Sequence, residues 1–203
     1  MSKSILLVIL FLGSLSAPAQ KAYKGYVGFG VGPSFITDYK FVNNSLGTGL
    51  NINLINFSYS FNDRWGITAT CSGGAHINQA SVRTSDPNGN PITVTSDYTG
   101  AYRLIMLGPV YSYFITEKSK LELKLRFGQF YYQEEFKASS SVFNMETAQS
   151  RLTYSLGLTY QYRFAKRWAA LTNLDFTTAK INTIGGEESI SPINLTAGIA
   201  FLF

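Results

Sequence analysis

The sequence has few residues that could cross-link it or bind a metal. Its 203 residues include one cysteine, Cys71, and one histidine, His76. A single cysteine excludes an intrachain disulfide and a zinc site built from several thiolates. Charged residues make up only 14% of the chain, against about a quarter in ordinary soluble domains. This low charge content is typical of a protein whose surface does not face water everywhere.

Long apolar runs and basic runs are also missing beyond the N-terminal region. No later segment reaches the roughly 18 consecutive apolar residues of a membrane-spanning helix. The formal net charge is +5, but the lysines and arginines are scattered. No nucleic-acid-binding motif accompanies them, so we expect no nucleic-acid partner. We also expect no metal and no other cofactor.

The first twenty residues, MSKSILLVILFLGSLSAPAQ, are typical of a secretory signal peptide. Lys3 supplies the charged start, residues 5–12 the apolar core, and Ala17-Pro18-Ala19 the small-residue cleavage site. No cysteine follows that site, which argues against a lipoprotein. We therefore predict a signal peptide over residues 1–19 and one exported domain over residues 20–203.

The sequence is rich in aromatics, at 15%, and in segments with a period of two. In RLTYSLGLTYQYRF, residues 151–164, every even position is apolar or aromatic and every odd position is polar, charged or glycine. This pattern predicts a long strand with one apolar face. Similar or less regular alternation predicts seven more strands, around residues 27–32, 46–61, 65–72, 98–115, 121–128, 168–180 and 193–203. A phase slip at Leu54-Ile55 predicts a β-bulge.

The connections between these strands alternate in length. Short links at residues 62–64, 116–120 and 165–167 alternate with long polar segments at 37–45, 78–97, 137–147 and 181–192. Short turns at one end and long loops at the other are typical of barrels in the outer membrane. The sequence therefore predicts an all-β fold: an eight-stranded antiparallel up-and-down transmembrane β-barrel.

The two faces of the strands distinguish this barrel from a soluble, lipocalin-like barrel with its apolar face inward. The face opposite the apolar one holds Gly28, Gly30, Gly128 and Gly157, and small residues suit the narrow lumen of an eight-stranded barrel. The longest strands also reach the roughly 9 to 11 residues that cross a bilayer. For residues 98–115, we expect Tyr102, Leu104 and Met106 to face outward, because this places Arg103 in the lumen.

The signal peptide, the eight alternating strands, the loop asymmetry and the aromatic terminus AGIAFLF resemble the small outer-membrane barrels of the OmpX or OmpA barrel-domain type. The resemblance covers the whole mature chain and implies a location in the cell outer membrane, surrounded by its lipid. It also implies that Phe201 and Phe203 form the signal read by the barrel-assembly machinery. We expect the protein to be a monomer.

A short internal repeat supports a common orientation of two turns. FNDRW at residues 61–65 and FAKRW at residues 164–168 share the pattern Phe-x-x-Arg-Trp. This places Trp65 and Trp168 on the same side of the barrel, where tryptophan favours the membrane–water interface. The alternative is two similar tight turns without a membrane role.

The predicted lumen contains charged residues, which a packed interior tolerates only when they are paired. They are Lys24, Arg103, Glu122, Lys124, Arg126, Arg151, Arg163 and Asp175. We predict a salt-bridge and hydrogen-bond network with Glu122 and Asp175 as its acceptors. A selective anion path is the alternative, favoured by the excess of basic residues and opposed by the small diameter of the barrel.

The function predicted from the sequence is that of a non-enzymatic barrel whose outer loops serve surface interaction, adhesion or envelope stability. Residues 78–97 could form a hairpin above the membrane and pair edge to edge with an extracellular or envelope protein. Two alternatives remain open. One is a lipid-modifying enzyme that uses His76 with Ser72 or Ser81, although a lone histidine is more often a hydrogen-bonded polar residue. The other is a narrow channel or a component of a secretion or assembly complex.

Overall fold

The computed structural model describes residues 23–37, 40–41, 44–45, 47–85, 88, 90–138, 144–183 and 186–203. The predicted signal peptide, residues 1–19, lies outside the described residues. Among the described residues, no helix is long and apolar enough to cross a membrane.

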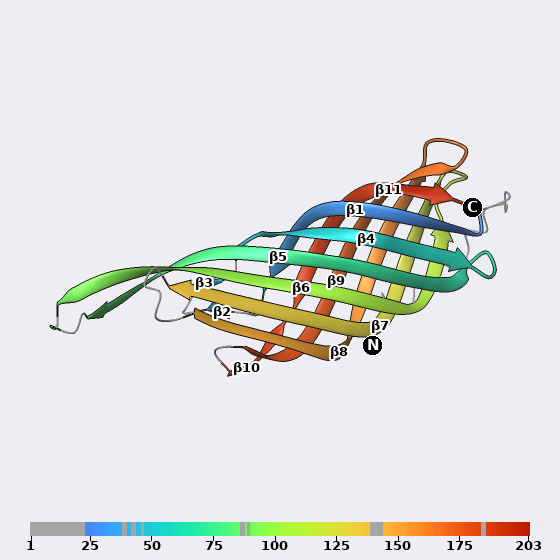
Figure 1. Ribbon diagram of the computed structural model, residues 1–203. Helices are drawn as coiled ribbons and strands as arrows, with labels where there is room; N and C mark the ends of the chain where they lie inside the picture. Colours follow the sequence, from blue (N-terminus) through green and yellow to red (C-terminus); the bar gives the residue numbers. More distant parts are fainter. Residues whose placement is uncertain are drawn as a thin grey trace, which may run out of the picture.

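Eight antiparallel strands close into an up-and-down barrel (Figure 1). They are β1 (Gly25–Ile36), β4 (Gly49–Ser60), β5 (Trp65–Ser85), β6 (Pro91–Phe114), β7 (Ser119–Ala138), β8 (Asn144–Arg163), β9 (Trp168–Thr183) and β11 (Pro192–Leu202). Two short strands form a separate sheet: β2 (Lys40–Phe41) pairs with β3 (Asn44–Ser45). A third, β10 (Gly186–Ile190), pairs with the end of β9 in the same register as β11 and so continues β11 along the wall. The predicted fold class is confirmed.

The first and last strands of the barrel pair with each other. The register places Val31 opposite Ala197, and the seam ends in two backbone hydrogen bonds between Gly25 and Phe203, at 3.1 and 3.0 Å. An unpaired backbone group in hydrocarbon costs several kcal/mol, so only a closed sheet can cross a bilayer. The start of β1 and the end of β11 lie beside the short turns. We call this side of the barrel the turn end and the opposite side the loop end.

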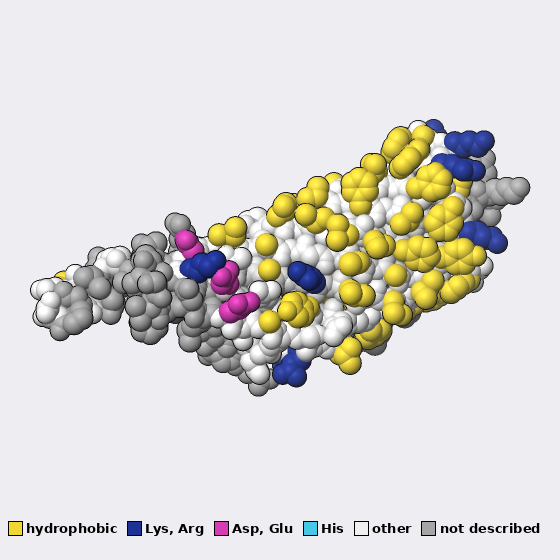
Figure 2. All heavy atoms as spheres, in the orientation of Figure 1, with side chains coloured by type: hydrophobic (Ala, Val, Ile, Leu, Met, Phe, Trp, Pro, Cys, Tyr) yellow, Lys and Arg dark blue, Asp and Glu magenta, His cyan; other side chains and the backbone are white. Residues whose placement is uncertain are grey.

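Apolar side chains cover the outside of the barrel wall (Figure 2). The register shifts between Asn53 and Ile55, as the phase slip in the sequence predicted, and the bulge leaves both Leu54 and Ile55 exposed on the outside. Trp65 and Trp168 are exposed beside the short turns and form edge-to-face contacts with Tyr111 and Phe201. An apolar wall with tryptophans at its margin is the arrangement of a membrane-embedded barrel.

One side of the barrel rises well above the other. The pairing of β4 with β5 ends at Leu50–Ala75, whereas β5 and β6 remain paired as far as Ser85–Pro91. Figure 1 shows this hairpin extending beyond the other strands. The segment 78–97, expected as a long loop that could continue as a hairpin, is therefore mostly a two-stranded extension of the wall.

The outward-facing row of β8 provides a test of the membrane-facing wall. Leu158 is exposed at the middle of this row, so we expect Leu158→Arg to cost about 2 to 4 kcal/mol of unfolding free energy, as arginine does at the bilayer midplane. Leu152→Arg is the matched control, because Leu152 is 89% exposed at the loop end of the row and the cost falls to about 0 to 1 kcal/mol near the interface. Denaturant unfolding in phospholipid vesicles measures both. Equal losses of unfolding free energy in Leu158→Arg and Leu152→Arg would show that Leu158 does not face the bilayer interior.

Candidate functional site

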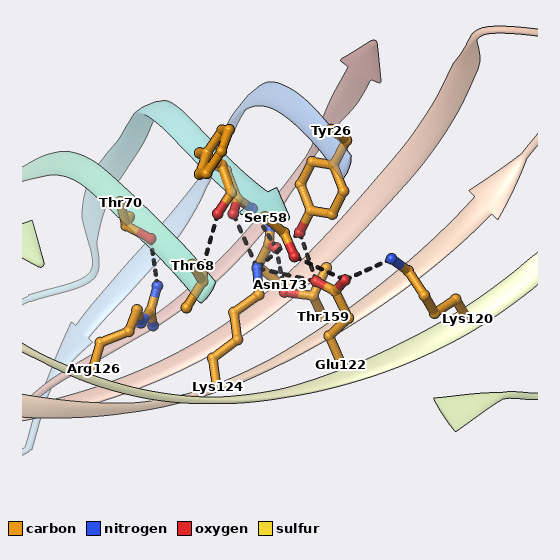
Figure 3. Close-up of polar contacts among 12 residues, drawn as sticks. Tyr26, Ser58, Thr68, Thr70, Lys120, Glu122, Lys124, Arg126, Thr159 and Asn173 are labelled. Atoms are coloured by element: carbon orange, nitrogen blue, oxygen red, sulfur yellow. Dashed lines mark hydrogen bonds and ion pairs between the residues drawn. The ribbon is translucent and has the colours of Figure 1, made fainter. Parts of the chain in front are cut away.

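The centre of the lumen is organised around the carboxylate of Glu122 (Figure 3). This side chain is completely buried, and its Oε1 lies 2.7 Å from Lys120 Nζ and accepts a hydrogen bond from Ser58 Oγ at 3.1 Å. Its Oε2 lies 3.5 Å from Lys124 Nζ and accepts from the Tyr26 hydroxyl at 2.8 Å. Lys120, Glu122 and Lys124 come from one strand, β7, whose period of two aims alternate side chains into the lumen. Two cations therefore share one carboxylate.

A second ion pair lies nearby on the same face of β7. Arg126 Nη2 is 2.5 Å from Asp175 Oδ1 and donates to Ser155 Oγ at 3.1 Å, while Nη1 donates to Thr70 Oγ1 at 2.7 Å. Gly157 makes room for this pair, since a Cβ there would lie 2.4 Å from Asp175 Oδ1 and 2.7 Å from Arg126 Nη2. A larger residue at position 157 would therefore displace the Arg126–Asp175 ion pair.

Neutral hydrogen bonds connect strands on opposite sides of the lumen. Asn56 of β4 donates to Asn173 of β9 at 2.8 Å, although β1 and β11 separate these strands in the wall. Asn173 also accepts from Thr159 and donates to Thr196. Lys124 donates to the Asn56 amide oxygen at 2.9 Å. Lys124 therefore joins the Glu122 group and these neutral groups in one network that braces the barrel from inside.

Apolar side chains pack on both sides of this network. Toward the turn end, one cluster consists of Tyr26, Ala169, Leu171, Ala200 and Leu202. Toward the loop end, a larger cluster consists of Ile36, Tyr98, Tyr102, Leu104, Met106, Phe130, Tyr132, Ala179, Ile181 and Ile190. The buried side chains of the lumen therefore form three layers: apolar, ionic, and aromatic or aliphatic.

The face assignment for β6 is wrong. Tyr102, Leu104 and Met106 are buried in the lumen, and Arg103 is exposed on the outer wall, with its guanidinium 5.9 Å from the centre of the Tyr131 ring. Both faces of β6 are apolar here, because Ile105 and Leu107 are also exposed on the outside. Alternation alone does not say which face is inward in such a strand. Arg103 can extend toward water from the outer wall while its aliphatic part covers apolar surface.

The structure separates the other predicted lumen residues into two groups. Glu122 and Lys124 meet in the central network, and Arg126 and Asp175 form the second buried ion pair. Lys24 and Arg151 are exposed instead, and Arg163 is half-buried, with Nη2 donating to the Glu117 carbonyl at 3.2 Å. Lys24 lies directly before β1 and Arg163 is the last residue of β8. At these two residues the lumen assignment fails where a strand leaves the packed barrel. Arg151 lies within β8, opposite the buried Phe130, and is exposed nonetheless.

Sequence reasoning missed several members of the network. Lys120 lies on the face of Glu122 and Lys124, two residues before Glu122, but was assigned to a turn. Three further members are uncharged: Tyr26, Asn56 and Asn173. The sequence shows only that they lie opposite the apolar face, which does not distinguish them from other polar lumen residues.

His76 is buried near the loop end of the lumen. Its Nδ1 lies 2.8 Å from the Gly47 carbonyl oxygen, which can only accept, so Nδ1 donates. Its Nε2 lies 3.0 Å from Ser34 Oγ, and the ring stacks on Tyr102. Tyr102 in turn donates to Asn194 at 2.5 Å. Ser34, from another strand, therefore supplies a hydroxyl at His76, whereas the enzyme hypothesis names Ser72 or Ser81. The side chain of Ser81 lies outside the described part of the chain.

Metal ligands are not grouped in this chain as far as it is described: no three His, Cys, Asp or Glu side chains among those residues lie together.

Solved structures with a similar fold include proteins of different kinds. Neisserial surface protein A is 14% identical, with a TM-score of 0.52 over 91% of this chain and 100% of that chain. The outer membrane protease OmpT from Escherichia coli is 12% identical, with a TM-score of 0.50 over 78% of this chain and 65% of that chain. Ail, the attachment invasion locus protein of Yersinia pestis, is 17% identical, with a TM-score of 0.49 over 90% of this chain and 99% of that chain. At such identities the likeness shows the fold alone.

Comparison of the sequence with curated proteins finds no match. The family described as outer membrane protein beta-barrel domain matches residues 7–203. Because this match covers nearly the whole chain, the protein belongs to the family of outer-membrane β-barrel domain proteins, which implies the outer membrane as its location.

Proposed function

We propose that this protein is a non-enzymatic, monomeric barrel with a side-chain-filled lumen, which contacts an extracellular or envelope protein through its projecting β5–β6 hairpin. The hairpin is the observation that carries the proposal. The described pairings give residues 80–85 of β5 no partner on β4, and residues 91–95 of β6 no partner on β7. Strand edges of this kind can accept an extended segment of another protein.

The packing of the lumen supports an interaction role over the alternatives. A narrow channel needs a continuous aqueous path, whereas here a buried ionic network lies between two apolar clusters. A histidine-dependent enzyme needs a histidine that substrate can reach. His76 is fully buried, and both ring nitrogens are engaged by Ser34 and Gly47. Of the basic residues that favour an anion path, Lys124 and Arg126 are paired with Glu122 and Asp175.

The network supplies the rigidity that a projecting hairpin needs, and its central carboxylate can be tested directly. Glu122→Gln keeps the size of the side chain but leaves Lys120 and Lys124 without their counter-charge. We expect it to cost about 3 to 5 kcal/mol of unfolding free energy, as for a broken buried pair. Glu135→Gln is the control, because the Glu135–Lys137 pair is also short, at 2.8 Å, but its side chains are 42% and 59% exposed. A solvent-exposed pair of this kind contributes little to stability, so we expect a much smaller loss in this variant.

Denaturant unfolding in vesicles measures both variants under the same conditions. A similar small loss of unfolding free energy in Glu122→Gln and Glu135→Gln would mean that water in the lumen screens the charges of the lysines. This result would contradict a lumen filled by side chains.

The interaction proposal is tested by shortening the hairpin. Gln79 and Asp97 are register partners, so replacing residues 80–96 with Asn-Gly closes the hairpin with a two-residue turn. We expect the variant to fold, and to lose binding to immobilised secreted and envelope proteins in a biosensor assay of nanodisc-embedded protein. Deletion of residues 140–142, in the β7–β8 connection, is the control and keeps the binding. Unchanged binding after hairpin shortening, or loss in both variants, contradicts the proposal.

A further inference from the structure

Three short turns at the turn end share one backbone pattern. In each five-residue turn, the first and second amides donate to the carbonyl oxygen of the fifth residue. The bonds are Phe61 and Asn62 to Trp65 at 2.9 and 3.3 Å, Ile115 and Thr116 to Ser119 at 3.0 and 3.2 Å, and Phe164 and Ala165 to Trp168, both at 3.2 Å. The internal repeat of the sequence thus extends to a third turn, 115–119, which has no tryptophan.

The same two positions of each turn carry the same kinds of side chain. The first residue is an exposed apolar one: Phe61 at 68%, Ile115 at 51% and Phe164 at 57% exposure. The fourth is an exposed cation: Arg64, Lys118 or Arg167. Each turn therefore places an apolar side chain and a cation at a fixed separation.

The backbone at these cationic residues is held in place by hydrogen bonds to neighbouring strands. The carbonyl oxygens of Arg64, Lys118 and Arg167 accept hydrogen bonds from the next hairpin or strand of the barrel, namely from Ser112 at 2.6 Å, Arg163 at 2.8 Å and Leu202 at 2.9 Å. Lys24, before β1, accepts from Ser60 in the same way, at 2.6 Å. The backbone at four cationic residues is thus fixed around the rim of the turn end.

The charge of this rim is strongly positive. Its exposed carboxylates are Asp63 and Glu117, against Lys24, Arg64, Lys118, Lys166 and Arg167, with Arg163 half-buried. Within the described part of the chain, Arg64, Lys118 and Arg167 form no ion pair. Figure 2 shows Lys and Arg side chains gathered at this end, next to the apolar wall.

The cations lie beside surface that faces lipid. The Arg167 guanidinium is 5.8 Å from the ring centre of Phe201, an outward-facing residue that also contacts Trp168. Trp65 and Trp168, each next to an arginine, are exposed at the margin of the apolar wall. An arginine beside interfacial tryptophan lies at the depth of lipid headgroups. Because short turns face the periplasm in this family of barrels, the leaflet concerned is the periplasmic one.

We propose that the turns 61–65, 115–119 and 164–168 are binding sites for anionic phospholipids of the periplasmic leaflet. Arg64, Lys118 and Arg167 contact the headgroup phosphate, and Phe61, Ile115 and Phe164 pack against the acyl chains. Fixed backbones and free side chains let each cation meet a phosphate at little ordering cost. This property is separate from the surface contact proposed above, because it uses the opposite end of the barrel.

The two tryptophans of the protein report directly on two of the three sites, the turns 61–65 and 164–168. The chain has only two, Trp65 and Trp168, and each belongs to one of the turns. The full mature protein is folded into vesicles of phosphatidylcholine and phosphatidylglycerol in which one lipid is brominated, so that tryptophan quenching gives the relative binding constant at the turns. We expect about a fivefold preference for phosphatidylglycerol, corresponding to the roughly 1 kcal/mol that one cation contributes near anionic lipid.

Matched variants separate these sites from general charge effects. Arg64→Gln, Lys118→Gln and Arg167→Gln together keep the backbone hydrogen bonds, and we expect them to reduce the preference to near one. Arg103→Gln, Arg151→Gln and Lys180→Gln remove three exposed cations outside the turn end and keep the preference. Raising salt from about 0.1 to about 1 M shortens the Debye length from about 10 to about 3 Å, so it reduces the preference of the unsubstituted protein.

Heat-dependent gel mobility verifies that each variant is folded. Equal quenching by both brominated lipids in the unsubstituted protein overturns the proposal. So does a preference that persists in the folded turn variant.

Discussion

Closure of the sheet between β1 and β11 is the constraint on which the rest of the structure depends. A strand edge in hydrocarbon would leave a row of amides and carbonyls without partners, at several kcal/mol each. The β1–β11 pairing removes that edge, and the bonds between Gly25 and Phe203 complete it at the turn end. Once the sheet is closed, one side of every strand must suit lipid and the other must fit inside a narrow tube. The sequence alternation is the direct expression of this requirement.

The narrow lumen of the closed barrel must bury several charged side chains. Eight strands leave space for side chains but little for water, so the charges of β7 need partners inside the protein. Glu122 compensates Lys120 and Lys124, and Asp175 compensates Arg126. The bonds of Tyr26, Asn56 and Asn173 reach strands that are not neighbours in the wall. The network therefore holds the barrel in shape, and the projecting β5–β6 hairpin rests on a rigid support.

The sequence predicts what depends on local pattern and misses what depends on strand tilt and stagger. Alternation in residues 151–164 and 193–203 assigns lipid-facing rows correctly, and the phase slip at Leu54-Ile55 locates the bulge. Tyr102 was misplaced because both faces of β6 are apolar, so that only packing across the lumen decides its direction. Lys24 and Arg163 have the parity of lumen residues but lie at strand ends, where the packed lumen has ended. Arg151 has the same parity within β8 and is exposed although its register partner Phe130 is buried. His76 meets Ser34 rather than Ser72, since the partner comes from the stagger of β1 against β5. The partners within the lumen network could not be predicted from residue spacing either, because they too depend on the stagger of the strands.

The closing seam is tested most directly by cross-linking across it. With Cys71→Ser removing the native thiol, Val31→Cys and Ala197→Cys place two thiols opposite each other on β1 and β11. Opposed residues have Cα atoms about 4.5 to 5.5 Å apart, within the Cα separation that a disulfide tolerates. Val31→Cys with Leu195→Cys shifts the pair by two residues on the same face, to a diagonal distance of about 7 to 8 Å. Oxidation of unheated protein in outer-membrane fractions, followed by gel mobility, distinguishes the two. Closure in the described register predicts efficient cross-linking of the first pair only. Failure of the first pair, or equal cross-linking of both, would contradict it.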